Sequence, residues 1–153
     1  MKHVKKIAIA LLVVFVGIQF IPTTLNQNNN VSVSDFLVVY NVPEEIENKI
    51  RVSCYDCHSD NTKYPWYSKI QPGALIMENH IKKGKEELNF SSFGDYSGRR
   101  KKSKLKSIIS QIRDDEMPIS SYTLLHRDAK LSENNKRLII DWVNNLIDSL
   151  NNK

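Results

Sequence analysis

Two cysteines and a histidine stand close together in the segment SCYDCHSDNTKYPWYSKIQPG, which runs from Ser53 to Gly73. Cys54 and Cys57 are the only cysteines of the chain, and His58 directly follows the second. This C-x-x-C-H pattern is the attachment motif of a c-type haem. Two thiols one helical turn apart can add to the two vinyl groups of a porphyrin, and the adjacent imidazole can bind the iron. The spacing therefore predicts a covalently attached haem c.

Three other kinds of site use cysteine pairs, and they stay open at this point. A structural zinc site needs four ligands, and His80 and His126 are available, although neither spacing matches a common zinc finger. A thioredoxin-type dithiol belongs in a βαβ setting, for which the sequence gives no pattern. The pair could also form a plain disulfide, although two cysteines are too few for a disulfide scaffold.

A second axial ligand for the iron is predicted at Met117, in the segment DDEMPISSY. A methionine sulfur in this position raises the reduction potential of a haem. His126 and His80 are alternatives, and either would give a bis-histidine site of lower potential. Each of the three also has a structural interpretation, because methionine fills gaps in cores and histidine often serves as a hydrogen-bonding group.

The aromatic run YPWYS is a candidate cover for the porphyrin. Tyr64, Trp66 and Tyr67 offer flat apolar faces to the ring, and their polar tips could reach its propionates. We therefore expect these three side chains to bind the cofactor. Ordinary packing within a loop is the alternative.

Helical patterns predict the elements that position these residues. A helix is expected from Pro43 toward Cys54, because Ile46 and Ile50 lie four apart on the face that leads to the first cysteine. Three more helices are expected at about 73–85, with Gly84 as its cap, at about 100–115, and after Ser132. No sustained strand alternation appears beyond the N-terminal segment, so the domain is predicted to be all-α.

The N-terminal segment MKHVKKIAIALLVVFVGIQFIP has the layout of an export signal, a short cationic stretch before an apolar run. We expect residues 1–22 to remain as a signal-anchor, a transmembrane helix with its charged end inside. A cleaved signal peptide is the alternative, since the run is roughly 15 residues where a full span needs about 20. The polar, asparagine-rich residues 23–40 then form a linker, and residues 41–150 form the haem-binding domain.

The charge of the chain is concentrated in two places. The formal net charge is +5, and without the three lysines before residue 7 the chain holds 19 basic and 17 acidic residues. That balance argues against a nucleic-acid partner. The segment RRKKSKLK carries six positive charges between Arg99 and Lys106. It could steer an acidic redox partner or lie against anionic lipid, or it could simply be a solvated helix start.

The blocks CxxCHS, YPWYS, LNFS, MP and HxxAxLS follow one another in this order, ahead of a last helix that bears a tryptophan. In this combination the chain resembles the haem-binding domain family of exported bacterial proteins, over about residues 41–150. The resemblance implies a cytochrome c-like small helical domain wrapped around one haem. It also implies a location on the periplasmic side of the bacterial inner membrane, or in the periplasm if the N-terminal segment is cleaved.

These features predict an exported, membrane-tethered monohaem c-type cytochrome that passes single electrons to a redox partner protein at the membrane. The alternative is a haem-based sensor for a diatomic gas or a peroxide, which would need a labile sixth ligand. A haem enzyme such as a peroxidase has less support, because no acid–base pair is evident beside an open site.

Overall fold

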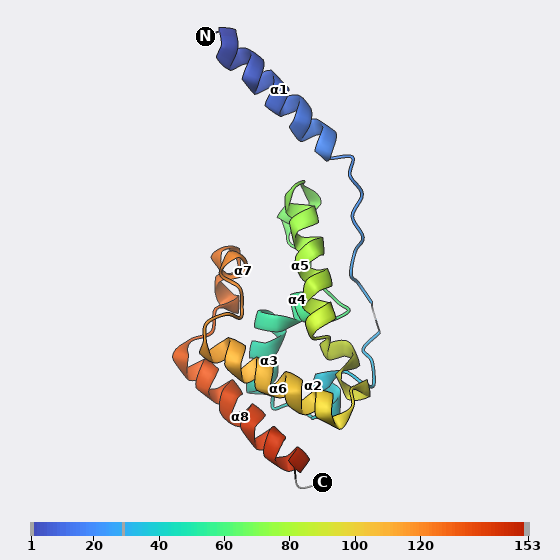
Figure 1. The fold of residues 1–153 in the computed structure, drawn as a ribbon, viewed down its shortest axis with the longest axis vertical. Helices are drawn as coiled ribbons and strands as arrows, with labels where there is room; N and C mark the ends of the chain where they lie inside the picture. Colours follow the sequence, from blue (N-terminus) through green and yellow to red (C-terminus); the bar gives the residue numbers. More distant parts are fainter. Residues whose placement is uncertain (1, 29, 152–153) are drawn as a thin grey trace.

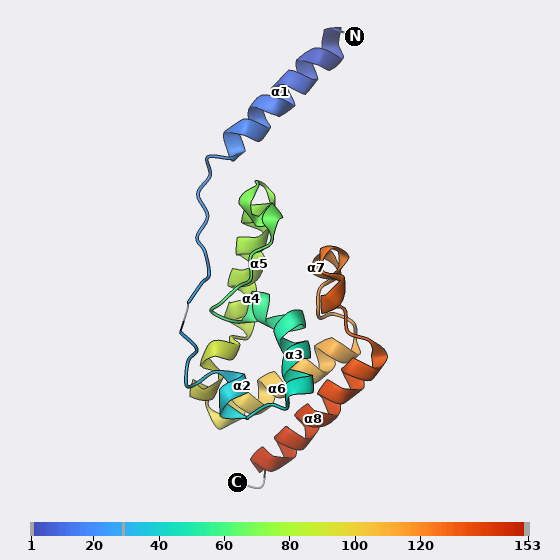
Figure 2. The same cartoon turned by 180° about the vertical axis from the view of Figure 1, so that it is seen from behind.

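The computed structural model describes residues 2–28 and 30–151. Helix α1 (Lys2–Ile18) stands apart at one end of the molecule, and the other helices form a packed domain (Figures 1 and 2). All regular structure in the described residues is helical, apart from one isolated antiparallel bridge between Gln27 and Asn61. The prediction of an all-α fold is therefore confirmed.

The cysteine pair lies at the end of one unbroken helical stretch. It consists of α3 (Glu44–Ile50), a π-helical turn η1 (Arg51–Tyr55) and α4 (Asp56–His58). Pro43 precedes the first helical residue, and acidic side chains occupy the first turn, where the helix dipole favours them. Ile46 and Ile50 are buried, as the sequence predicts. This stretch carries the C-x-x-C-H motif into the middle of the domain.

Three longer helices frame this stretch. Helix α5 (Gly73–Glu87) packs against α4, and α6 (Gly98–Arg113) packs along α8 (Glu133–Asn151). Each helix buries one apolar face: Ala74, Met77 and Ile81 in α5; Leu105, Ile109 and Ile112 in α6; Ile139, Val143 and Ile147 in α8. The expectation that Gly84 caps α5 is wrong, because the helix continues past Gly84 and Leu88 is its cap residue.

Short helical turns fill the long connections. They are α2 (Phe36–Val39), η2 (Trp66–Lys69), η3 (Phe90–Asp95), α7 (Ser120–Leu125) and η4 (Arg127–Ala129). Phe36 is the centre of an aromatic cluster, with ring centroids 5.2 Å from Phe90, 4.9 Å from Phe93 and 5.8 Å from Trp142. Phe36 lies within the predicted linker, so the packed unit begins before residue 41.

The segment that follows α1, which includes the end of the predicted anchor and the start of the predicted linker, is held against the domain. The side chain of Gln71 donates to the carbonyl of Ile21, and the side chain of Gln19 accepts from the backbone N–H of Gln71 at 3.0 Å. Further along, the backbone N–H of Asn28 donates to the carbonyl of Asp60 at 3.0 Å. The chain leaving α1 thus runs beside α5 rather than hanging free (Figure 1).

Helix α1 has 17 residues, and none of them is buried. Of the helices that the structure describes, none is both long and apolar enough to cross a membrane, so the expected transmembrane anchor is not supported.

Candidate functional site

His58 is oriented by two backbone carbonyls. Its Nδ1 atom lies 2.9 Å from the carbonyl oxygen of Gly84 and 3.0 Å from that of Leu88. Carbonyl oxygens only accept hydrogen bonds, so Nδ1 carries a proton, and in the neutral imidazole Nε2 then keeps a free lone pair. An imidazole held in this way is prepared to bind a metal through Nε2.

The close approach of α5 to the motif depends on Gly84. A Cβ atom at this position would lie only 2.6 Å from the carbonyl oxygen of Cys57. With no side chain there, α5 comes near enough for its last carbonyls to reach the ring of His58. The residue has a packing role that its place in the sequence did not indicate.

The two cysteines carry free thiols that are held in the protonated form. Burial and the neighbouring Cys57 raise the pKa of Cys54 to about 12. Burial and the charge of Asp56 raise the pKa of Cys57 to about 11. Dithiol redox sites depend on a lowered thiol pKa. The electrostatics therefore disfavour thiolate chemistry for this pair.

Two adjoining hollows, of about 300 and 340 Å³, open next to the motif. Both are lined by Ser53, Cys54, His58, Glu87 and Met117. Leu88, Phe90, Ile108 and Ile112 add apolar surface to the first, and Cys57, His80, Ile119 and Tyr122 to the second. Taken together the hollows have the size and apolar lining of a site for a large flat ligand.

The structure thus brings Met117 and His80 to the same place as His58 and the cysteines. Met117 lines both hollows, whereas His80 lines one. The assignment of the sixth ligand remains a prediction between these two, with Met117 touching more of the space beside His58.

His126 lies elsewhere, at the end of α7. Its Nε2 atom is 2.7 Å from the hydroxyl of Tyr67, and its ring stacks on that of Tyr122 with centroids 4.2 Å apart. It lines neither hollow beside His58. The structure therefore does not bring this predicted alternative ligand to the candidate site.

The three aromatic residues expected to cover a porphyrin also lie outside the two hollows. The hydroxyl of Tyr64 accepts from the backbone N–H of Asn26 at 2.7 Å, Tyr67 faces His126, and Trp66 is 76% exposed. All three lie in the long connection between α4 and α5.

The other readings of the cysteine pair gain no support. The two cysteines are not joined by a disulfide. Within residues 2–28 and 30–151, no three side chains of His, Cys, Asp or Glu gather as a metal cluster would require.

The model of the haem-binding domain family matches residues 13–145. The chain belongs to the haem-binding domain family. No curated protein and no solved structure shows significant similarity to it. Haem is the cofactor that this membership supports, and the protein is a haem-binding protein.

The donors present fit a haem. The haem-binding domain offers two protonated thiols, an imidazole with a free Nε2 and an apolar hollow, and these are the groups that a c-type site uses. Cys54, Cys57 and His58 would hold the cofactor from one side, and Met117 or His80 would supply the second axial donor.

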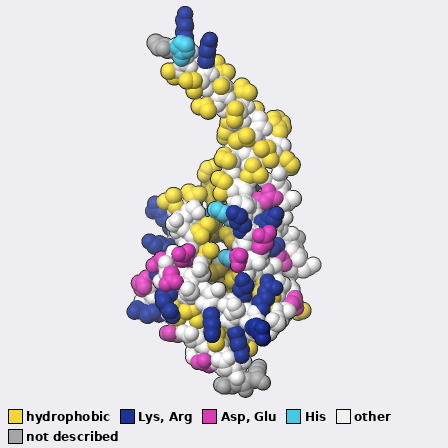
Figure 3. Space-filling view, in the orientation of Figure 1, with side chains coloured by type: hydrophobic (Ala, Val, Ile, Leu, Met, Phe, Trp, Pro, Cys, Tyr) yellow, Lys and Arg dark blue, Asp and Glu magenta, His cyan; other side chains and the backbone are white. Residues whose placement is uncertain are grey.

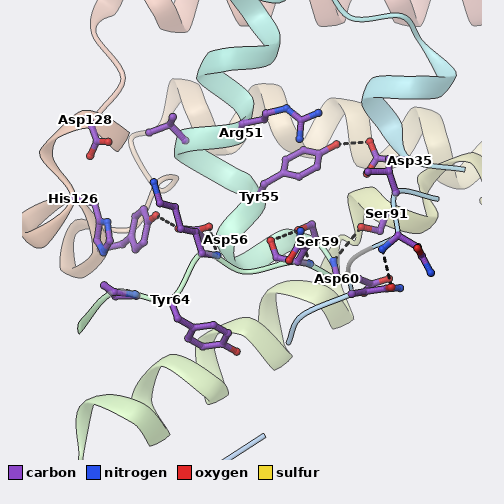
Figure 4. A pocket seen from close by; sticks show the side chains of 18 residues that line it. Asp35, Arg51, Tyr55, Asp56, Ser59, Asp60, Tyr64, Ser91, His126 and Asp128 are labelled. Carbon is purple, nitrogen blue, oxygen red and sulfur yellow. Dashed lines mark hydrogen bonds between the residues drawn. The ribbon is translucent and has the colours of Figure 1, made fainter. Parts of the chain in front are cut away.

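A further cavity, of about 370 Å³, is bordered by the motif helix, and Figure 4 shows the polar side chains of Tyr55, Asp56 and Ser59 along it. Val52, Tyr55, Asp56 and Ser59 line it, whereas Ser53, Cys54, Cys57 and His58 face the haem side. The hydroxyl of Tyr122 donates to Asp56 at 2.7 Å, and both residues border the two spaces. Burial and Asp56 raise the pKa of Tyr122 above its usual range. The sequence analysis did not single out Tyr122, because no local pattern indicates that this side chain borders both the cavity and the hollow beside His58.

Proposed function

We propose that this haem-binding protein is an exported monohaem c-type cytochrome that transfers single electrons. The observation that carries the proposal is the setting of His58. Its Nδ1–H is fixed by the carbonyls of Gly84 and Leu88, its neighbours are two free thiols, and the hollow that it borders also holds Met117.

The haem would supply the one-electron chemistry, and the protein would hold it in place. Cys54 and Cys57 would hold it covalently, each thiol adding across one vinyl C=C bond with its sulfur on one carbon and its hydrogen on the other. The addition needs no oxidant. Because the raised pKa values keep Cys54 and Cys57 protonated, each thiol holds both the sulfur and the hydrogen that the addition uses.

Met117 is the proposed sixth ligand. An iron bound by both His58 and Met117 would have no open position for a substrate, which suits electron transfer better than substrate chemistry. A Met/His pair also gives a higher reduction potential than two imidazoles.

We propose a redox protein at the membrane as the partner, and the periplasmic side of the inner membrane as the location. The basic start of α6 lies close to the haem side, because Lys104 lines the first hollow and contacts Glu87 at 3.5 Å. An acidic partner would be steered to this surface, and its association rate would fall with ionic strength.

The test is to remove both thiols. The wild-type chain, matured in cells that have the haem-attachment apparatus, should keep its haem through denaturation and organic extraction. The double variant Cys54→Ser, Cys57→Ser should lose it. Haem that leaves the wild-type protein under denaturing conditions would refute covalent attachment.

Carbon monoxide separates electron transfer from the sensor alternative. Slow or absent binding to the reduced wild-type protein is expected if Met117 occupies the sixth position. Rapid binding would favour a haem-based sensor for a diatomic gas or a peroxide.

A further inference from the structure

The end of the domain next to α1 exposes large apolar side chains. They are Trp66 at 76%, Leu124 at 76%, Leu125 at 63%, Ile76 at 53% and Ile70 at 42% exposed. We call these five residues the apolar end. Elsewhere in described residues 30–151, the large apolar side chains that are exposed to this degree are all valines.

Four of the five residues of the apolar end lie on two elements, and the fifth, Ile76, lies on α5. Trp66 and Ile70 belong to η2 and its cap, and Leu124 and Leu125 close α7. The hydroxyl of Tyr67 and Nε2 of His126, 2.7 Å apart, join the two elements directly behind these side chains. A hydrogen-bonded support of this kind holds the two parts of the surface in a fixed relation.

Helix α1 leaves the molecule from the same end. Its last turn is tied to the start of α5 by Gln71, which is 4% exposed and bonded to Gln19 and Ile21. The apolar side chains of α1 are exposed on every face. Figure 3 shows apolar side chains along α1 and at the adjoining end of the domain, with most charged side chains farther away.

From these observations we propose that the apolar end of the domain seats on the lipid surface of a membrane, beside α1. This inference rests on the proposed membrane location and adds to it the face by which the domain itself makes contact.

The side chains suit a lipid interface better than another protein surface. Trp66 is of the type that collects at the level of lipid headgroups. Exposed basic residues border the apolar side chains, with Lys69 beside Ile70 and Arg127 two residues after Leu125. Apolar groups rimmed by cations complement an anionic lipid surface.

The experiment is hydrogen exchange of the full haem-loaded chain, with and without vesicles of phosphatidylcholine and phosphatidylglycerol. We expect several-fold slower exchange at residues 66–71 and 120–126 on vesicles, in addition to protection of α1. Protection confined to α1 would overturn the inference, and so would a chain that does not bind vesicles. A chain that does not bind vesicles would also refute the proposed membrane location, whereas protection confined to α1 would leave that proposal intact.

A matched pair of variants locates the contact. Leu124→Glu with Leu125→Glu should abolish the protection at residues 66–71 and 120–126 while the haem spectrum stays unchanged. Val33→Glu with Val38→Glu, at exposed positions in and before α2, should leave it in place. Equal protection in both variants would contradict the proposal.

Self-association is the rival explanation for a covered apolar end. It would give protection without vesicles that grows with protein concentration, together with a doubled mass in sedimentation. That result would mean that a second copy of the chain, and not a membrane, covers the apolar end. The absorbance of the same samples reports haem content, so a failure of haem binding is seen separately.

Discussion

Gly84 and His58 are joined by a hydrogen bond of 2.9 Å from the ring Nδ1–H to the backbone carbonyl. Gly84 also allows the contact sterically, because a Cβ atom there would meet the carbonyl oxygen of Cys57 at 2.6 Å. Gly84 therefore orients the imidazole of His58 through its carbonyl and, by lacking a side chain, allows α5 to lie close to α4.

We predict that Gly84→Ala separates α5 from α4. The clash is with backbone, which cannot swing aside as a side chain can, so the free energy of unfolding should fall by about 1–3 kcal/mol. This outweighs the roughly 1 kcal/mol that alanine gains over glycine within a helix. Chemical denaturation measures the loss, and the haem spectrum should shift as His58 loses its orientation.

Gly98→Ala is the matched control, because nothing lies within 4 Å of a Cβ atom at that helix start. Its free energy of unfolding should change by about 0.5 kcal/mol or less. If the two alanine variants are equally stable and share one spectrum, the close approach at Gly84 has no structural role.

We predict that Met117→Leu removes the sixth ligand while preserving its volume. The ferric protein should lose its sulfur-to-iron charge-transfer absorption, the reduction potential should fall because the thioether raises it, and carbon monoxide should bind faster to the reduced form. Absorption spectroscopy and a redox titration measure these changes.

Met77→Leu is the corresponding control, since Met77 is buried on the core face of α5 and lines neither hollow beside His58. Its spectrum should match the wild type. A normal spectrum in Met117→Leu combined with an altered one in His80→Ala would move the assignment to His80.

The helices could be predicted because their signals are local. Ile46 and Ile50, or Leu105 and Ile109, lie one turn apart in the sequence, and their burial follows from that spacing alone. By contrast, α2 is a helix of four residues whose Phe36 is 1% exposed in an aromatic cluster. Its conformation depends on burial against distant segments, which periodicity over so few residues does not reveal.

The sequence predicts the residues that could bind the haem, but not the long-range contacts that position them. The spacing of Cys54, Cys57 and His58 carries their chemistry, but the contact of His58 with Gly84 spans 26 positions. The residue type of Trp66 leaves its role open, because an aromatic ring suits a porphyrin face and a lipid interface equally well. Its place in the fold, 76% exposed at the end next to α1, could not be predicted from the sequence.

We predict that Tyr55 makes the protein sensitive to alkali. Its hydroxyl donates to the buried Asp35 at 2.8 Å, and burial followed by the charge of Asp35 raises its pKa. The folded pKa lies above the unfolded value near 10. The contribution to stability is therefore complete below about pH 10 and is lost as the pH rises further.

Tyr55→Phe should cost about 1.5–3 kcal/mol at neutral pH, since the lost bond is to a charged group. Above about pH 10, its free energy of unfolding should fall less steeply than that of the wild type. Urea denaturation from about pH 8 to about pH 11 gives both slopes. Parallel curves for the two proteins would show that ionisation of Tyr55 is not coupled to folding.

We predict that Asn26 fastens the segment after α1 to the motif. Its side chain donates to the carbonyl of Ser59 at 2.8 Å and to the hydroxyl of Thr62 at 2.9 Å, and it accepts from Lys85 at 2.7 Å. Ser59 and Thr62 are each 1% exposed. Asn26→Ala removes the hydrogen bond to the carbonyl of the buried Ser59, at a cost of about 1–3 kcal/mol, whereas the hydroxyl of Thr62 keeps its bond to the carbonyl of Asp56.

The expected result is faster hydrogen exchange at residues 24–28 and 59–62, and easier proteolysis between α1 and the domain. Asn28→Ala is the control, because the backbone N–H of Asn28, and not its side chain, bonds to Asp60. Since Ser59 directly follows His58, loosening in Asn26→Ala should also broaden the haem absorption. Unchanged exchange at residues 59–62 would mean that the segment lies on the domain without supporting the motif.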